Sequence, residues 1–461
     1  MSRLVPDPNI SLDELRALLD REQIRFFRIG VFDVDGILRG KHVCRDKFFS
    51  VVEKGFGFCD VVLGWDAHDK LYDNTQASGW HTGYRDAPVR LDLSTLRRLP
   101  HEPDTILVLG DFAGSYAEVC PRRTLRRVLA KAEAMGYTAQ AALEYEFFLF
   151  SETPQSVREK GYRDLTPVTP GMFGYSVLRS SVLHEFHQGL LELFDGMEVE
   201  IEGLHTETGP GVLEAAIRHD DALVAADKAA LLKTFTKVFA QRHGLMATFM
   251  AKWSTQYPGQ SGHAHTSLFS VKDGRGLFFE GAADHGMSAL MRQYIAGQVS
   301  LMPEVLPMVC STINSYRRMV PGMWAPLSAN WGVENRTTAI RVIPGSERSQ
   351  RSEYRIGPAD ANPYLILAAA IGSGLHGIER ALDPGAPIQG SAYDLPSPGP
   401  GGLPLPRNLA AATHEFKRSA SARRLFGDAF VEHYAATREW EVREYERHVS
   451  DWDLARYFEI I

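Results

Sequence analysis

The spacing of hydrophobic positions changes from helical to strand-like within the first part of the chain. Residues 11–21 open with a Ser-x-x-Glu pattern and carry leucines at helical spacing, which predicts a short amphipathic helix. Residues 26–33 and 37–43 alternate like strands around a tight Asp-Gly turn. This pattern predicts a small, β-rich N-terminal domain that ends near residues 100–104.

Beyond that domain, stretches of strand type and helix type follow one another. Strands are predicted at residues 106–109, 138–150, 248–252, 262–269 and 338–343, and helices at residues 124–134 and 220–241. Residues 383–407 are dense in Pro and Gly, which predicts an exposed loop, and residues 408–461 return to a helical pattern. We therefore predict an α+β fold with two domains, residues 1–103 and 104–461, the larger with an antiparallel sheet flanked by helices.

Composition and charge narrow the class of protein. With 461 residues, 44% hydrophobic and 23% charged, the chain is an ordinary globular protein with more than one core. The net charge of −7 comes without clustered Lys or Arg, which argues against binding to nucleic acid or to an anionic membrane. No apolar run is long enough to cross a bilayer, no export signal opens the chain, and the four cysteines form no CxxC pair. We expect a cytoplasmic protein with reduced thiols.

Three predicted strands carry acidic, basic or imidazole groups at every second position. Side chains two residues apart on a strand share a face. The paired positions are Glu144 and Glu146, His263 and His265, and Arg351, Glu353 and Arg355. A Gly-Pro-Gly turn between Glu207 and Glu214 can bring two more carboxylates together. Each of these strands thus presents charged or metal-binding groups on one face.

Any one of these pairs alone is most simply a solvent-exposed strand face. Together, five carboxylates flanked by apolar residues would each be costly to bury without a partner, so either they are exposed or cations neutralise them. Oxygen ligands with an imidazole suit Mg²⁺ or Mn²⁺, whereas zinc favours more His or Cys. Two such ions would retain enough positive charge to bind a polyphosphate.

Arginines are frequent in the second half of the chain, close to these strands. Their forked donors match carboxylate and phosphate groups. They are Arg317, Arg318, Arg336, Arg341, Arg348, Arg351 and Arg355. Carboxylates beside arginines are the combination that phosphoryl transfer needs.

Six motifs in chain order resemble the glutamine synthetase family. They are residues 144–148, 207–214, 259–265, 314–322, 335–341 and 351–355, the last followed by Asp-Ala-Asn-Pro-Tyr at 360–364. The resemblance implies the family fold, in which a β-grasp N-terminal domain precedes a catalytic domain with a curved antiparallel sheet. It also implies a homododecamer of two stacked hexameric rings, with active sites between the N-terminal domain of one subunit and the catalytic domain of the next.

The resemblance further implies a role for each residue. Two or more divalent ions, Mg²⁺ or Mn²⁺, are expected. The ligands of the ion beside glutamate are Glu146, Glu207 and Glu214, and those of the ion on ATP are Glu144, His263 and Glu353. The residues expected to contact the nucleotide phosphates are His265, Ser267, Arg341, Arg348 and Arg351. Glutamate is held by Arg318, Arg355 and the Gly259 backbone, and the transferred phosphoryl group is stabilised by Arg336.

The implied reaction joins glutamate to an amine. Phosphorylation by ATP gives the γ-carboxylate a good leaving group, and an amine then attacks γ-glutamyl phosphate, which exclusion of water protects. Three functions follow from the resemblance. The chain is a γ-glutamyl-amine ligase acting on a polyamine or another alkyl or aryl amine, or a glutamine synthetase using ammonia, or a non-catalytic structural or regulatory relative.

Three positions depart from the family pattern. Trp324 stands where ammonia-using members carry Glu, two residues after the Pro-Gly of the flap. A neutral indole cannot take up the proton of ammonium, but it offers a cation–π surface to an alkylammonium group. Val212 and Pro258 replace a Gln and an Asn near the glutamate site. The first departure predicts an amine larger than ammonia.

Two assignments stay open at this point. The aspartate that a neighbouring subunit contributes to the amine site aligns with Asp60 or Asp66, and Asp66 is favoured. Tyr393-Asp-Leu-Pro resembles the adenylylation loop of some bacterial members, and it is equally well a turn in a Pro/Gly-rich loop.

Overall fold

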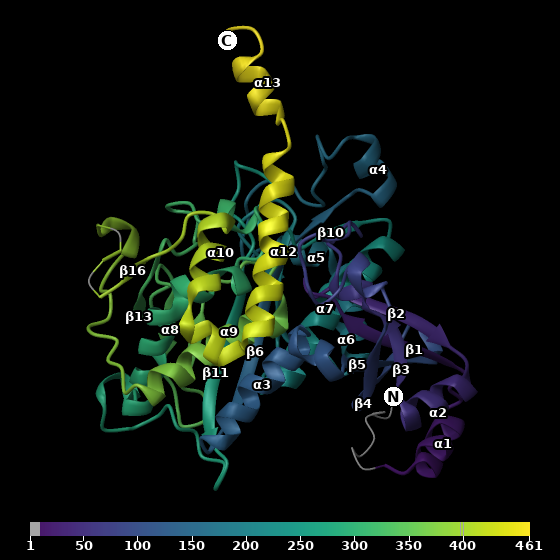
Figure 1. Ribbon diagram of the computed structural model, residues 1–461. Helices are drawn as coiled ribbons and strands as arrows, with labels where there is room; N and C mark the ends of the chain where they lie inside the picture. Colours follow the sequence, from purple (N-terminus) through teal and green to yellow (C-terminus); the bar gives the residue numbers. More distant parts are fainter. Residues whose placement is uncertain (1–9, 397, 400) are drawn as a thin grey trace.

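The computed structural model describes residues 10–396, 398–399 and 401–461. Two main sheets organise these residues, a smaller one near the N-terminus and a larger one covered by helices (Figure 1). A third sheet has only two strands, β12 (Ser328–Ala329) and β16 (Leu403–Pro404). The α+β class predicted from the sequence is confirmed. Residues 1–9 of the predicted N-terminal domain, and residues 397 and 400 of the predicted loop, lie outside the described residues.

The N-terminal region contains the predicted helix and hairpin, a second helix and three further strands, and its five strands form the smaller sheet. Its elements are α1 (Leu12–Arg21), β1 (Phe26–Phe32), β2 (Leu38–Val43), α2 (Arg45–Lys54), β3 (Phe56–Cys59), β4 (Asp86–Leu99) and β5 (Glu102–Phe112). Ser11 caps α1 through a reciprocal pair of hydrogen bonds with Glu14, as the Ser-x-x-Glu pattern predicts. The strand order is β2-β1-β5-β4-β3, in which only β1 and β5 run parallel.

Strand β5 corrects one prediction. The sequence predicts residues 106–109 as a strand of the larger domain, which is wrong, because β5 pairs with both β1 and β4 of the smaller sheet. Ile106 and Val108 are fully buried and pack with Phe27 and Phe48 in the N-terminal core. The predicted domain boundary between residues 103 and 104 remains a prediction.

The larger sheet has the strand order β13-β14-β15-β11-β6-β8-β7, and β9 and β10 also pair with β6. Its strands are β6 (Tyr137–Phe150), β7 (Ile201–Thr206), β8 (Val212–Ile217), β9 (Asp220–Asp221), β10 (Met246–Thr248), β11 (Gly262–Ser270), β13 (Trp331–Val333), β14 (Ile340–Ile343) and β15 (Arg351–Tyr354). All pairs are antiparallel except β13 with β14. The predicted strand at residues 248–252 is wrong beyond Thr248, because the Thr248 hydroxyl accepts the Met250 amide and turns the chain.

Helices pack on the face of the sheet opposite the charged side chains. They include α3 (Pro121–Ala134), α7 (Ala222–Arg242), α8 (Ala289–Val309) and α9 (Pro363–Glu379). Leu143, Tyr145 and Phe147 of β6 are fully buried in the core that these helices share with the sheet. The intervening residues Glu144 and Glu146 point away from that core, as the alternation predicts.

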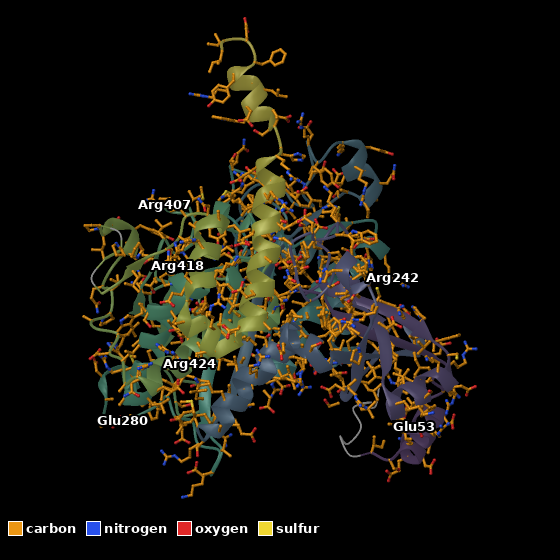
Figure 2. The ribbon with its side chains drawn as sticks, viewed as in Figure 1. Glu53, Arg242, Glu280, Arg407, Arg418 and Arg424 are labelled. Carbon is orange, nitrogen blue, oxygen red and sulfur yellow. The ribbon has the colours of Figure 1, made fainter. Side chains whose placement is uncertain are left out.

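The C-terminal part is helical, as predicted. It consists of α10 (Leu409–Arg418), α11 (Ala420–Phe426), α12 (Asp428–Glu446) and α13 (Asp451–Tyr457). Figure 1 shows α12 along the body of the molecule and α13 standing away from it. Charged side chains such as Arg407, Arg418 and Arg424 lie around the outside (Figure 2). No helix of the described residues is long and apolar enough to cross a membrane.

The predicted exposed loop at residues 383–407 is partly wrong. Ile388 is 5% exposed and Leu405 9% exposed. The Ile388 amide donates to the carbonyl of Trp331 at 2.9 Å, and the Trp331 indole donates to the carbonyl of Pro384 at 3.0 Å. Buried apolar side chains and these hydrogen bonds hold the segment against the larger domain.

Candidate active site

Side chains from neighbouring strands and loops line one cavity of about 640 Å³. Most of the predicted site residues are in its lining: Glu144, Glu146, Glu207, Glu214, Gly259, His263, His265, Arg318, Trp324, Arg336, Arg341, Arg351, Glu353 and Arg355. Of the predicted set, Ser267, Arg348 and Asp66 are not in this lining.

The pairing register of the larger sheet explains this gathering. Glu146 on β6 lies opposite Glu214 on β8. His265 on β11 lies opposite Glu353 on β15. Because opposed side chains on antiparallel strands have Cβ atoms about 4.5–5.5 Å apart, the sheet places acidic groups from separate motifs side by side. They form two clusters.

The first acidic cluster consists of Glu146, Glu207, Glu214 and His205. His205 Nε2 lies 3.2 Å from Glu207 Oε1 and 3.4 Å from Glu214 Oε1. Burial and the charge of Glu146 raise the pKa of Glu214 to about 9. Burial also raises the pKa of Glu146, against the hydrogen bonds it accepts from Ser261. Carboxylates with so little compensating charge suit a hard divalent cation.

The second acidic cluster consists of Glu144, Glu353, His263 and His265. Arginines neutralise it. Arg341 Nη1 donates to Glu353 Oε2 at 3.0 Å, and Arg355 Nη1 donates to Glu353 Oε1 at 2.5 Å. Burial alone would raise the pKa of Glu353, but Arg355 and the two histidines lower it to about 2. This cluster is therefore ionised and already paired within the protein.

Both imidazoles reach the carboxylates of the second acidic cluster. His263 Nδ1 lies 3.3 Å from Glu353 Oε1, and His265 Nε2 lies 3.2 Å from Glu144 Oε1. Burial lowers the pKa of His263 to about 4, which keeps this ring neutral and able to bind a cation. The ligand atoms that lie within 4.8 Å of one another come from Glu144, His265 and Glu353. The geometry thus brings His265 into the set, and the choice of His263 as the ligand stays a prediction.

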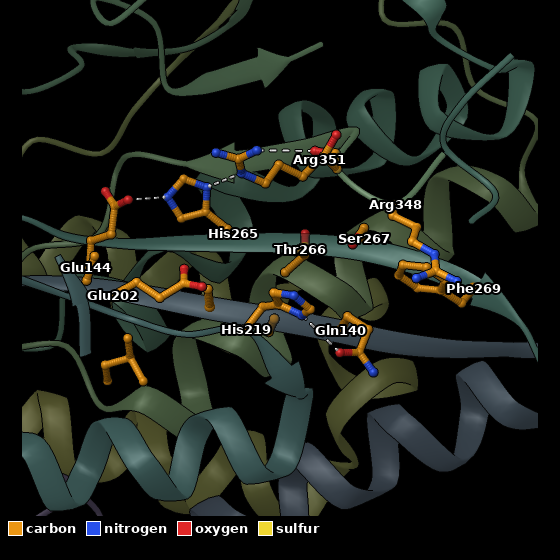
Figure 3. A pocket seen from close by; sticks show the side chains of 15 residues that line it. Gln140, Glu144, Glu202, His219, His265, Thr266, Ser267, Phe269, Arg348 and Arg351 are labelled. Carbon is orange, nitrogen blue, oxygen red and sulfur yellow. Dashed lines mark hydrogen bonds and ion pairs between the residues drawn. The ribbon is translucent and has the colours of Figure 1, made fainter. Parts of the chain in front are cut away.

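A second cavity of about 260 Å³ adjoins the first and shares Glu144, His265 and Arg351 with it (Figure 3). Arg351 Nε donates to His265 Nδ1 at 3.2 Å. Ser267 and Arg348 line this second cavity. The residues predicted to contact nucleotide phosphates therefore extend from the acidic clusters into it.

The residues predicted to hold glutamate lie together in the wall of the larger cavity. Arg318 and Arg355 are 2% and 4% exposed. Arg318 donates to the carbonyls of Ile356 and Arg355 at 3.2 and 3.3 Å, which fixes its guanidinium. A Cβ atom at Gly259 would lie 2.6 Å from the Ala251 carbonyl oxygen, so the backbone at this point requires glycine. Two fixed guanidinium groups suit a carboxylate.

Trp324 lines the same cavity from the loop at residues 319–327, called the flap below. It is 54% exposed, and its φ of +60° is in the left-handed region that bulky residues rarely adopt. The flap contains no acidic residue. The flap side chains that line the cavity are the neutral indole of Trp324 and the thioether of Met323.

The chain matches the description "Glutamine synthetase, catalytic domain" over residues 118–457. It belongs to the glutamine synthetase family. Type-1 glutamine synthetase 2 of Dictyostelium discoideum is 45% identical over 440 residues, 95% of this chain and 84% of the relative. Glutamate–isopropylamine ligase of a Pseudomonas species is 37% identical over 456 residues, 97% of this chain and 98% of the relative.

A solved structure has the same fold. The GmaS/ADP complex is 25% identical, with a TM-score of 0.83 over 96% of this chain and 99% of that chain. The glutamine synthetase fold expected from the six motifs is confirmed. Enzymes of the glutamine synthetase family are ligases that use ATP and divalent metal ions, and the two acidic clusters provide suitable oxygen and nitrogen donors.

Two residues of the site were missed at the level of sequence. His205 lies on β7 and precedes Glu207, the first residue after this strand, by two positions, so the alternation that found the other pairs could have found it. Tyr175 comes from a loop, and its ring stacks on His205 at 4.7 Å with an interplanar angle of 12°. Tyr175 also lines the cavity of this glutamine synthetase family member. No local pattern in the sequence indicates it.

The two candidate aspartates of the amine site differ in their surroundings. Asp60 is fully buried and accepts hydrogen bonds from the hydroxyls of Thr82 and Tyr116, both at 3.0 Å. Asp66 lies in a loop and accepts the amides of His68 and Lys70 at 2.8 Å. Neither lines the two cavities of its own chain. A role of Asp66 in a neighbouring subunit stays a prediction.

Proposed function

We propose that this protein is an ATP-dependent ligase that joins a primary amine to the γ-carboxylate of glutamate through γ-glutamyl phosphate. The observation that carries the choice of amine is the neutral Trp324 in the cavity lining, on a flap without any carboxylate. Such a flap offers no base to ammonium, whereas an indole face stabilises an alkylammonium group by about 0.5–2 kcal/mol. A relative named for isopropylamine supports an amine of this kind.

The acidic clusters are the proposed binding sites of two or more divalent ions, Mg²⁺ or Mn²⁺. Glu146, Glu207 and Glu214 would hold one ion, and the ligands of another would be Glu144, His263 and Glu353. The raised pKa of Glu214 supports this, because no arginine or lysine among the described residues forms an ion pair with the group. When bound, such ions supply positive charge to phosphate and carboxylate oxygens.

The remaining residues position the two substrates and the phosphoryl group. In the proposal, ATP phosphates are bound by His265, Ser267, Arg341, Arg348 and Arg351, and glutamate by Arg318, Arg355 and the Gly259 backbone. A γ-carboxylate oxygen attacks the γ-phosphorus and ADP leaves, while Arg336 stabilises the charge that develops. The amine nitrogen then attacks the carbonyl carbon, phosphate leaves, and Asp66 of the partner subunit takes the proton.

A glutamine synthetase reaction with ammonia is the second candidate. The identity of 45% with a type-1 glutamine synthetase favours it. The two candidates share every step up to the attack of the nitrogen, so they differ only in the nucleophile that the flap admits.

The test is a panel of nucleophiles assayed with glutamate and ATP. We expect kcat/KM to be low for ammonium and higher for methylamine, isopropylamine, putrescine or spermidine. Trp324→Glu should raise kcat/KM for ammonium relative to the best amine, by roughly the 2- to 30-fold that a cation–π contact contributes. Trp324→Phe, which keeps a neutral aromatic ring, is the matched control. If ammonium is the best substrate of the unaltered enzyme, the second candidate is correct.

We also propose the double hexameric ring. The exposed apolar side chains of α13 and the residues after it support self-association, with Trp452 61%, Phe458 83% and Ile461 93% exposed. An amine site completed by Asp66 of the partner subunit would leave an isolated monomer inactive. Light scattering together with activity on dilution tests this, and an active monomer would contradict the proposal.

A further inference from the structure

The segment at residues 388–394 is hydrogen-bonded to two of the loops that bring non-strand residues into the larger cavity. One is the turn at residues 335–337, which carries Arg336, and the other is the flap, which carries Trp324. Tyr393 lies in this segment, in the Tyr-Asp-Leu-Pro motif that the active site does not use. The segment thus connects two parts of the site that are separate in the sequence.

At the turn, hydrogen bonds hold the backbone on both sides of Arg336. Asn335 Nδ2 donates to the carbonyls of Gly390 at 2.8 Å and Ile388 at 3.3 Å. The Ala392 amide donates to Thr337 Oγ1 at 2.9 Å. Thr337 Oγ1 in turn donates to Asn335 Oδ1 at 2.6 Å, so the turn and the segment form one hydrogen-bonded unit.

At the flap, the contact is a single side-chain hydrogen bond. Tyr393 Oη donates to the carbonyl oxygen of Ala325 at 3.0 Å. Ala325 is fully buried, while the preceding Trp324 is half-exposed and adopts a φ of +60°. A bulky residue keeps this unfavourable backbone conformation only where its surroundings hold it. The Tyr393 hydrogen bond is formed at the next residue, Ala325, and can hold this conformation in place.

The surroundings of Tyr393 favour this role. Burial raises the pKa of its phenol, although Arg318 and Arg355 oppose the shift, so the hydroxyl remains a donor at neutral pH. Tyr393 belongs to the same segment that is hydrogen-bonded to the turn carrying Arg336. Tyr393 therefore joins the flap to a fixed part of the cavity wall.

We propose that Tyr393 is a positioning residue that holds the flap, and with it Trp324, over the acyl phosphate. A held flap would admit the nitrogen nucleophile and exclude water. When the flap is loose, water attacks the γ-carbonyl carbon instead, and glutamate and phosphate are released without amide formation. The proposal rests on the proposed ligase reaction, but not on which nitrogen nucleophile is used.

Tyr393→Phe removes the hydrogen bond and keeps the ring, so the full-length protein should fold normally. With the nucleophile that the unaltered enzyme uses best, ammonium included, we expect kcat/KM for the nucleophile to fall roughly 3- to 10-fold, the effect of one neutral hydrogen bond. The ratio of ADP to γ-glutamyl product should rise, and the KM for ATP should stay within about twofold. A merely structural role would not change the ratio of ADP to product.

Hydrogen exchange of the flap gives a readout that needs no activity. Peptides covering residues 320–326 should exchange faster in Tyr393→Phe, and peptides of β1 should not change. Tyr162→Phe, the same replacement at a tyrosine that is 61% exposed, is the matched control and should change nothing. Unaltered flap exchange, or an unaltered ratio of ADP to product in a variant whose flap exchanges faster, would overturn the proposal. A wild-type enzyme that makes no γ-glutamyl product would instead refute the ligase reaction and leave the exchange result to decide on the flap.

Discussion

The first and second acidic clusters lie on adjacent strands of one sheet and share β6, yet their charge is balanced in different ways. In the second acidic cluster, Arg341 and Arg355 pair with Glu353, whose pKa is lowered to about 2. In the first acidic cluster, Glu214 faces other carboxylates, and its pKa is raised to about 9. Residues of the same type are therefore compensated by charges of the protein to different degrees, and the first cluster is compensated less.

The electrostatic difference follows from which strand lies on each side of β6. On one side, β11 and then β15 bring imidazoles and arginines, and Arg341 of β14 lies opposite Glu353. On the other side, β8 and β7 bring Glu214 and His205 and no arginine that pairs with them among the described residues. The predictions below use this asymmetry, from the largest expected effect to the smallest.

Removal of one carboxylate from either cluster should abolish ADP formation. Glu146→Ala and Glu353→Ala each remove a proposed metal ligand, and metal ions contribute several kcal/mol to phosphoryl transfer, which corresponds to a loss on the order of 10³-fold. Coupled ADP release with glutamate and the best amine measures the effect, and circular dichroism checks that each variant is folded. Glu53→Ala, at an exposed position of α2 (Figure 2), is the control. Near-normal turnover in either cluster variant would refute the assignment of that cluster.

The two clusters should respond in opposite directions when one charge is neutralised in metal-free protein. Glu353→Gln leaves Arg341 and Arg355 without their buried carboxylate and should lower the free energy of unfolding by about 3 kcal/mol. Glu214→Gln removes the cost of keeping this buried group protonated above its ordinary pKa and should raise that free energy, by about 1 kcal/mol. Thermal unfolding in the presence of a chelator at pH 8 measures both shifts, with Glu185→Gln on the surface of α6 (His184–Gly196) as control. Shifts of the same sign would show that the two clusters do not differ as described.

Much of this site could be predicted from the sequence because strands impose a two-residue period. The alternation placed Glu144 with Glu146 and Arg351 with Glu353, and the structure puts all four in the cavity lining. The sequence could not show that Glu146 lies opposite Glu214, because the register depends on pairing between distant strands. The opposite balance of charge in the two clusters could therefore not be predicted from the sequence.

Contacts made by loops could not be predicted from the sequence either. Tyr175 enters the cavity from an irregular segment, and Tyr393 reaches the flap from a stretch whose Pro and Gly content predicts an exposed loop. Composition indicates where a chain lacks regular structure, but not what fixes it in place. Strand β5 was assigned to the wrong sheet for a related reason, since β1 and β5 are parallel and distant in sequence.

The smallest expected effect is a pH dependence of the stabilisation by Mg²⁺. The pKa of Glu214 is raised above the ordinary value of 4.5, so its contribution to stability is complete below about pH 4.5 and is lost as pH rises towards about 9. A cation that binds the ionised group displaces its proton. Mg²⁺ should therefore increase the melting temperature more at pH 8 than at pH 6. For one displaced proton, the free energy of stabilisation by Mg²⁺ changes by at most about 1.4 kcal/mol per pH unit. Glu353 is ionised throughout this range and should contribute nothing to the change.

Proton release on Mg²⁺ binding, measured by calorimetry in two buffers, gives the same quantity independently, and Glu214→Gln should remove most of it. Equal stabilisation by Mg²⁺ at both pH values would show that Glu214 is already ionised in the metal-free protein, and the contrast between the two clusters would then be lost.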